Sequence, residues 1–289
     1  MNDSADKTIF EQSVPGRRAI RWPAPIGPAP IESHPHLLRQ RPAALPELSE
    51  LDVVRHFTAL SRRNFSVDTH FYPLGSCTMK YNPRASEVAA SLPGFSNLHP
   101  LWPQLRHGGQ LTQGALQLLY ELERMLSNIC GMAEFTLQPL AGAHGELTGI
   151  MLIAAYHRDR GNRKTHIIVP DAAHGTNPAS ATLGGYEVVS IPSRRDYHMD
   201  VDRLLASIRP DTAGVMLTCP DTLGAFPTRI REIADAVHAV DGLLYYDGAN
   251  LNALLGRVKP GQLGFDVCHV NLHKTFSTPH GGGGPGSGP

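Results

Sequence analysis

Short apolar runs alternate with helical stretches over the second half of the chain, and this alternation limits the possible folds more than any other feature. Between the runs lie helical stretches, the clearest over 230–240, where apolar residues recur at helical spacing. Strands that alternate with helices build parallel sheets covered by helices. The sequence therefore predicts an α/β fold with a mainly parallel sheet. The strand-like runs cover residues 166–170, 186–191, 214–218, 243–246 and 265–270.

The same kind of pattern predicts further elements upstream. Apolar residues at helical spacing predict a helix over 46–63 and a long amphipathic helix over 111–129, which ends at Gly131. A short strand is expected over 135–138, and another helix over 149–160.

A proline-rich segment precedes these elements. Prolines interrupt any helical or strand period over residues 15–46, so an extended arm is expected there, either disordered or laid across a partner surface. We expect residues 1–65 to form this arm and the first helix, and residues 66–289 to form one domain.

The two most informative side chains follow consecutive apolar runs. Asp247 closes the run 243–246, and Lys274 follows the run 265–270. Ligands of parallel α/β sheets collect at the carboxyl ends of the strands, where both side chains are expected. An amine for a Schiff base and a carboxylate that keeps a pyridinium nitrogen protonated are what pyridoxal 5'-phosphate (PLP) requires. The alternative is a surface lysine followed by a turn.

Two loops at this edge can supply further cofactor contacts. Gly142, Ala143 and His144 join a predicted strand to a helix, so their amides and the helix N-terminus can receive a phosphate dianion. Loops of this composition are also common as simple turns. His174 follows the run 166–170 and is placed to stack on a planar ring, whereas a capping or core histidine is the alternative.

Three more residues complete the predicted cofactor contacts: Thr218 at the end of its strand, the small Ala249, and His273 beside the lysine. A competing interpretation makes His269 and His273 zinc ligands. A spacing of four in a strand-like run sets such ligands far apart, and no Glu or Cys partner stands at a suitable interval. We therefore expect no metal site.

Composition excludes some function classes. The 26 basic and 26 acidic residues balance, so bulk charge suggests neither nucleic acid nor an anionic membrane as a partner. No apolar stretch reaches the length of a membrane span, and the first residues do not resemble a secretory signal. A cytoplasmic location is expected. Four scattered cysteines without CxxC spacing are expected to be reduced packing residues: Cys77, Cys130, Cys219 and Cys268.

Several motifs together resemble the glycine decarboxylase P-protein of the glycine cleavage system. The resemblance covers nearly the whole chain, and the start looks like the second subunit of the split, two-chain bacterial form. The motifs are residues 9–18, 60–65, 73–80 (PLGSCTMK), 137–146, 173–181 (AHGTNPASA), 247–253 (DGANLNA), 271–276 (NLHKTF) and 279–286 (PHGGGGPG).

This resemblance implies a type I PLP fold, that is, an aspartate aminotransferase-like large domain. It implies that Lys274 binds PLP covalently, that Asp247 pairs with the ring nitrogen and that His174 stacks on the ring. The implied reaction is decarboxylation of glycine with transfer of the aminomethyl group to the lipoyl arm of a carrier, the H-protein. The implied partner is a homologous first subunit, in a heterotetramer.

Three positions depart from the family pattern. Thr278 stands where the family has Ile or Val, and His144 stands where Gln is common. The chain ends at Pro289, so we expect it to be a truncated form without the family's small C-terminal domain.

Two other functions remain open. One is another PLP lyase, a desulfurase or amino acid decarboxylase, with Cys77 and Cys219 as candidate persulfide carriers; the other is a catalytically inert truncated subunit.

Overall fold

The computed structural model describes most of the chain, in two compact units that comprise residues 1–72 and 73–289. The described residues are 7–21, 23, 35–41, 43–66, 68–70, 81–99, 112–278 and 286–289. The PLGSCTMK motif with Cys77, and the glycine run 281–284, lie outside the described residues.

The first unit contains the predicted first helix, α1 (Glu50–Ser61), and a short 3₁₀ helix, η3 (Pro35–Leu37). The side chain of Ser49 accepts a hydrogen bond from the Asp52 amide, and the Asp52 carboxylate accepts one from the Ser49 amide, both at 3.2 Å. This reciprocal cap fixes the start of the helix, which is why it begins at Glu50 and not at 46. Hydrogen bonds from Ser49 also lower the pKa of Asp52.

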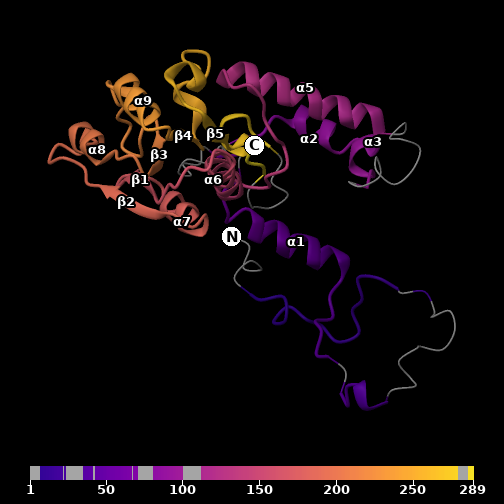
Figure 1. Ribbon diagram of the computed structural model, residues 1–289. Helices are drawn as coiled ribbons and strands as arrows, with labels where there is room; N and C mark the ends of the chain where they lie inside the picture. Colours follow the sequence, from indigo (N-terminus) through magenta and orange to yellow (C-terminus); the bar gives the residue numbers. More distant parts are fainter. Residues whose placement is uncertain are drawn as a thin grey trace. The chain divides into compact units, whose positions relative to one another are not determined.

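The second unit is built on a five-stranded sheet whose strands are all parallel, in the order β2-β1-β3-β4-β5 (Figure 1). This confirms the predicted fold class and all five strand-like runs. The expected strand over 135–138 is wrong, because that segment pairs with no strand in the described part of the chain. The strands are β1 (His166–Pro170), β2 (Glu187–Ile191), β3 (Thr212–Thr218), β4 (Leu243–Gly248) and β5 (Val267–Val270).

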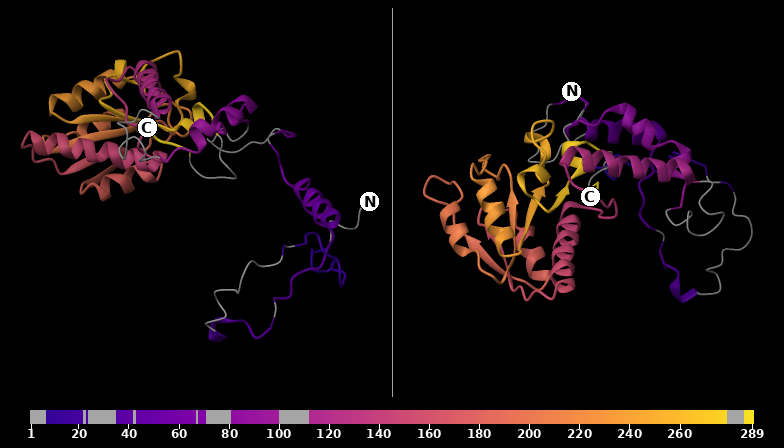
Figure 2. Two further views of the ribbon diagram at one scale, coloured as in Figure 1. Left: turned by 90° about the vertical axis from the view of Figure 1, so that its right-hand side faces the viewer. Right: turned by 45° about the horizontal axis from the view of Figure 1, so that its top comes forward.

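Helices cover both faces of the sheet (Figures 1 and 2). None of the described helices combines the length and the apolar character needed to cross a bilayer. The helices of this unit are α2 (Arg84–Ala90), α3 (Pro93–Ser96), α5 (Gln113–Cys130), α6 (Gly142–Asp159), α7 (Thr176–Leu183), α8 (Val201–Ser207), α9 (Ile230–Ala239) and α10 (Leu272–Thr275), with 3₁₀ helices η5 (Leu251–Ala253) and η6 (Pro260–Leu263).

Side chains that alternate along the strands form two separate cores. Ile167 of β1 packs with Ile150 and Ile153 of α6 on one face. Ile168, its neighbour in the sequence, packs with the side chains of α8 and α9 on the other face. Successive residues of a strand point to opposite faces, so a strand buried on both sides reads as a continuous apolar run. The result is a three-layer α/β/α unit.

Helix α6 begins earlier than predicted, at Gly142 and not near Gly149. Glycines occupy several of its buried positions, so the apolar periodicity of a helix is not visible in the sequence there. They also let the helix lie close to the sheet. At Gly149, an added Cβ would lie 2.4 Å from Cε2 of Tyr245 on β4. Helix α5 ends as expected at Gly131, whose φ of 69° is left-handed.

Candidate active site

A cavity of about 700 Å³ opens at the carboxyl end of the sheet. It lies where β3, β4 and β5 end and where α6 and α7 begin. All the predicted site residues except His144 line it. The lining residues are Ala141, Gly142, Ala143, Glu146, His174, Thr176, Thr218, Pro220, Asp221, Thr222, Asp247, Ala249, Asn250, Asn271, His273 and Lys274.

Asp247, the fifth residue of β4, is 2% exposed. Its Oδ2 accepts a hydrogen bond from the Asn177 side chain of α7, and its Oδ1 accepts one from the Ala249 amide, both at 3.0 Å. These two bonds hold the carboxylate in one orientation.

Lys274 lies on α10, directly after β5, and is half-buried. It therefore reaches the cavity from the strand next to the one that carries Asp247. His273 is buried beside it, with Nδ1 3.1 Å from the Ser287 carbonyl oxygen. The structure thus brings the predicted amine and the predicted carboxylate to one cavity.

The first turn of α6 supplies backbone amides at the cavity. Its N-cap residue, Ala141, makes no side-chain cap, so the first N–H groups of this helix keep their donor capacity. Gly142 is required there because a Cβ would lie 2.4 Å from Oδ1 of Asn271. A helix N-terminus of this kind stabilises a phosphate.

His144 does not line the cavity, contrary to its predicted place among the cofactor contacts. It is exposed on the first turn of α6, and its Nδ1 accepts a hydrogen bond from the Leu140 amide at 3.1 Å. The reason is helical geometry: residues two apart on a helix point in different directions, so His144 turns away where Gly142 faces the cavity.

Glu146 is a site residue that the sequence reasoning did not single out. It is 3% exposed, and its Oε1 accepts a hydrogen bond from the Thr176 hydroxyl at 2.7 Å. The same hydroxyl lies 2.6 Å from Nδ1 of His174. Burial raises the pKa of Glu146, against the lowering effect of the Thr176 hydrogen bond. An acidic residue within the apolar, glycine-rich first turns of this helix was the available signal.

His269 forms a second buried contact with Asp247. Its Nε2 lies 3.4 Å from Oδ1 of Asp247 and 4.0 Å from Oε1 of Glu146, and its Nδ1 lies 2.6 Å from the Tyr245 hydroxyl. Burial lowers the pKa of His269, which favours the neutral ring. In the described part of the chain, the ligand atoms of Glu146, Asp247 and His269 lie within 4.8 Å of one another, and His273 does not belong to this group.

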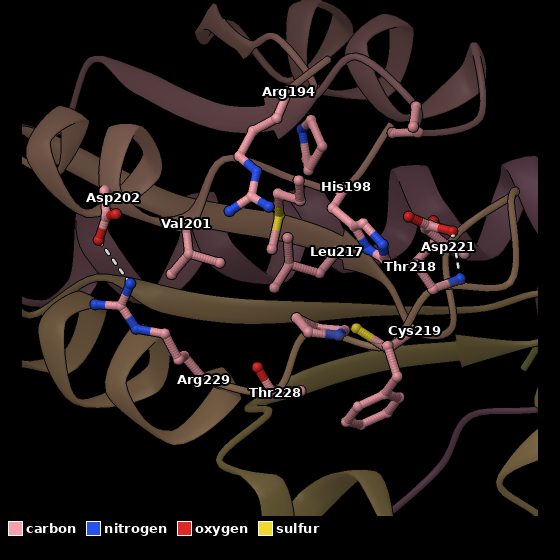
Figure 3. Close-up of a pocket in the computed structure, with 17 residues that line it drawn as sticks. Arg194, His198, Val201, Asp202, Leu217, Thr218, Cys219, Asp221, Thr228 and Arg229 are labelled. Carbon is pink, nitrogen blue, oxygen red and sulfur yellow. Dashed lines mark hydrogen bonds and ion pairs between the residues drawn. The ribbon is translucent and has the colours of Figure 1, made fainter. Parts of the chain in front are cut away.

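A second cavity, of about 340 Å³, adjoins the first and shares Thr218 and Asp221 with it (Figure 3). Its mouth carries Arg229, which is ion-paired at 2.6 Å with Asp202 and also with Glu232. The lining residues are Pro170, Ala172, Ala173, Arg194, His198, Met199, Val201, Asp202, Leu217, Thr218, Cys219, Asp221, Ala225, Phe226, Pro227, Thr228 and Arg229.

Cys219 lies in this second cavity but is poorly suited to carry a persulfide. It is 1% exposed, and burial raises the pKa of its thiol to about 12. The thiolate is the nucleophilic form of cysteine, so this side chain is inert at neutral pH. Cys77, the other candidate carrier, lies outside the described residues.

Solved structures share this fold. A glycine decarboxylase (P-protein) of the glycine cleavage system, in inhibitor-bound form, superposes with a TM-score of 0.67 at 22% identity, over 89% of this chain and 56% of that one. A Burkholderia pseudomallei sphingosine-1-phosphate lyase gives 0.63 at 16% identity, over 90% and 61%. An Oryza sativa TDC with PLP and tryptamine gives 0.60 at 15% identity, over 88% and 58%. At these identities the likeness concerns the fold.

Sequence comparisons add the family. The aminotransferase class-V model matches residues 144–283. The probable glycine dehydrogenase (decarboxylating) subunit 2 of Nitrosococcus oceani is 58% identical over 97% of this chain and 57% of its own length. The protein of the same name from Alkaliphilus oremlandii is 54% identical over 100% of this chain and 59% of its own length. The chain thus spans less than two thirds of the length of these relatives.

The fold and the segment 144–283 are of the aminotransferase class-V type. Curated relatives at 54–58% identity over nearly the whole chain are glycine dehydrogenase (decarboxylating) subunit 2 proteins. The resemblance to the P-protein, and to the second subunit of its split form, is therefore confirmed.

The residues of the cavity fit the cofactor that this family implies. Besides the amine and the carboxylate, three lining side chains each keep a buried polar atom without a hydrogen-bond partner in the described part of the chain. A polar ligand would satisfy such atoms, which are costly to bury unpaired. These atoms are Glu146 Oε2, Thr218 Oγ1 and Asn271 Oδ1.

Proposed function

We propose that this chain carries the PLP centre of a glycine decarboxylase. The reaction releases the carboxyl group of glycine as CO₂ and passes the aminomethyl group to the lipoyl arm of a carrier protein, the H-protein. The names of the curated relatives support the decarboxylation of glycine. Because the chain spans 57% of the first of these relatives, the activity is a proposal for the whole protein.

One observation carries this proposal more than any other. Lys274 and Asp247 come from the ends of the neighbouring strands β5 and β4 and line the same cavity. A primary amine and an ionised carboxylate in one cavity are the pair that PLP requires. Lys274 would hold the cofactor through Nζ. Asp247 would hold a proton on the pyridine nitrogen, with its own orientation kept by Asn177 and the Ala249 amide.

Bound PLP supplies an electron sink for the pair that remains on the substrate carbon when CO₂ leaves. The residues of this chain would bind the cofactor and orient it. The amides of Gly142 and Ala143 would receive the phosphate, and His174 would stack on the ring. Thr218, Ala249 and His273 would complete the contacts around the cofactor.

The same proposal includes the partners. The name "subunit 2" of the relatives supports a partner subunit. We assign this role to a homologous first subunit, in a cytoplasmic heterotetramer, with the proline-rich arm of residues 15–46 laid across the partner.

Borohydride reduction of the PLP-loaded protein, followed by peptide mapping, tests the central assignment. We expect the pyridoxyl group on Lys274, and we expect Lys274→Ala to abolish labelling. Lys259→Ala is the matched control, because Lys259 precedes η6 and does not line the cavity, and it should label normally. A pyridoxyl group on Lys259 or Lys80 in the unmodified protein would overturn the assignment.

A further inference from the structure

Glu146, Thr176 and His174 form a chain of hydrogen bonds that runs from a buried carboxylate to the cavity. The Thr176 hydroxyl donates to Glu146 Oε1 at 2.7 Å, and the same oxygen lies 2.6 Å from Nδ1 of His174. A hydroxyl has one proton to donate. With that proton on Glu146, the Thr176 oxygen accepts from His174. This 2.6 Å contact favours the imidazole proton on Nδ1, against the longer 3.4 Å approach of the Thr176 amide.

We propose that Glu146 is a positioning residue that acts through Thr176 to keep the His174 proton on Nδ1, which leaves Nε2 as an unprotonated acceptor. This inference rests on the proposed function and deepens it. An unprotonated Nε2 can take a proton from the ammonium group of an amino acid bound in the cavity. The ring then becomes an imidazolium whose Nδ1–H still points to Thr176.

Without Glu146, the local backbone favours the opposite tautomer. The Thr176 amide nitrogen lies 3.4 Å from Nδ1 of His174 and is directed at it. With no carboxylate to take its proton, the Thr176 hydroxyl could also donate to Nδ1. Both donors would make Nδ1 an acceptor and move the ring proton to Nε2.

Several polar and ionisable groups surround Glu146 and determine how readily its carboxyl group ionises. Asp247 of β4 lies close to Glu146, and Nε2 of His269 on β5 lies 4.0 Å from Glu146 Oε1. The charge of Glu146 also interacts with Tyr245 and His174. Burial and the Asp247 charge raise the pKa of Glu146, while Thr176, Asn177 and His174 lower it. Acidification should therefore protonate Glu146 at a higher pH than an exposed glutamate. The Thr176 hydroxyl is then no longer held as a donor to an ionised carboxylate.

Nitrogen NMR of histidine-labelled full-length protein without PLP tests the tautomer directly, with His174→Gln assigning the signal. We expect Nδ1–H in the unmodified protein and in Thr176→Ser, which keeps the hydroxyl. We expect Nε2–H in Glu146→Met and in Thr176→Val. Thr182→Val is the matched control, because it removes a hydroxyl of α7 that donates only to the Pro178 carbonyl.

An Nε2–H tautomer in the unmodified protein, or Nδ1–H retained in Thr176→Val, would overturn the inference. If Glu146→Met fails to fold, the Val and Ser variants at position 176 still decide the matter.

Kinetics of the PLP-loaded protein with its partner provide the second readout. Loss of a well-placed proton acceptor should lower kcat for glycine decarboxylation about 100-fold in Glu146→Met and Thr176→Val, with a smaller change in KM and rescue in Thr176→Ser. Unchanged kcat in both variants would refute the role. Failure of the unmodified protein to bind PLP at Lys274 would instead refute the proposed function. The NMR experiment is done without PLP, so it would still test the tautomer of His174.

Discussion

The Tyr245 hydroxyl lies 2.6 Å from Nδ1 of His269, inside the layer between α6 and the sheet. Both side chains are fully buried, and burial raises the pKa of Tyr245 well above its ordinary value. The phenol therefore keeps its proton. Nε2 of His269 faces Oδ1 of Asp247 at 3.4 Å, which favours N–H at Nε2, and with that tautomer the phenol donates to Nδ1. Tyr245 and His269 thus form a buried hydrogen-bonded pair next to the Asp247 carboxylate of the candidate active site.

Tyr245→Phe is expected to destabilise the fold by about 1–3 kcal/mol, because the buried Nδ1 of His269 loses its donor. The free energy of unfolding in urea measures the effect. Tyr197→Phe serves as the control, since the Tyr197 side chain is exposed and should leave stability unchanged. Equal stability of the two variants would mean that the Tyr245 hydrogen bond contributes nothing.

Asp247→Asn should weaken PLP binding about 10- to 100-fold, the equivalent of losing one hydrogen bond to a charged group. A neutral amide cannot stabilise a positive charge on the ring nitrogen. Absorbance titration with PLP measures the affinity. Asp235→Asn, an exposed position on α9, is the control and should bind normally. Normal affinity in Asp247→Asn would remove Asp247 from the cofactor site.

Glu146→Gln should stabilise the protein without PLP at neutral pH. Burial raises the folded-state pKa of Glu146 above its ordinary value of 4.5, so the folded state disfavours the ionised form. In the unmodified protein, the stability present below pH 4.5 is lost as the pH rises through the raised pKa. The gain in Glu146→Gln should therefore appear above that pKa and vanish on acidification.

Unfolding free energies of Glu146→Gln and the unmodified protein, measured over a pH series, provide the check. Glu187→Gln, at an exposed position on β2, is the control for the same substitution outside the cavity. A pH-independent difference for Glu146→Gln would contradict the raised pKa.

Gly149→Ala should cost about 1–3 kcal/mol, because an added methyl overpacks the contact between α6 and Tyr245. Gly114→Ala in α5 is the matched control, since no atom lies within 4 Å of its would-be Cβ. This change should stabilise the protein by about 0.5–1 kcal/mol, as alanine favours a helix. Thermal unfolding distinguishes the two, and a stabilising Gly149→Ala would show that α6 can shift outward.

The sheet was predictable because its three central strands, β1, β3 and β4, are buried on both faces, so each reads as a nearly continuous apolar run. His166–Pro170 matches its predicted bounds, and the ends of these runs led to Asp247 and Lys274. The residues 135–138 have a similar composition, but no strand of the described segments pairs with them. Local sequence reports whether a segment suits a strand, whereas a partner strand is a property of the whole fold.

The contacts that complete the site could not be predicted in this way. Glu146 and Thr176 are 30 residues apart, and only the packing of α6 beside α7 brings them together. Glycine at the start of α6 suggested a loop, although here glycine lets the helix approach Asn271. The direction of the His144 side chain could not be predicted either, because it depends on the helix that was expected to begin later.

The pairing of β3 with β4 joins Thr218 to Asp247 at the last position of the ladder. Asp247 lies two residues after Tyr245, so its carboxylate belongs to the row of side chains that faces α6. One residue inserted into β4 ahead of it would turn that carboxylate toward α8 and α9, whereas two would keep its side but move it about 7 Å. Substitutions along this strand can therefore be tolerated during evolution where single insertions or deletions cannot.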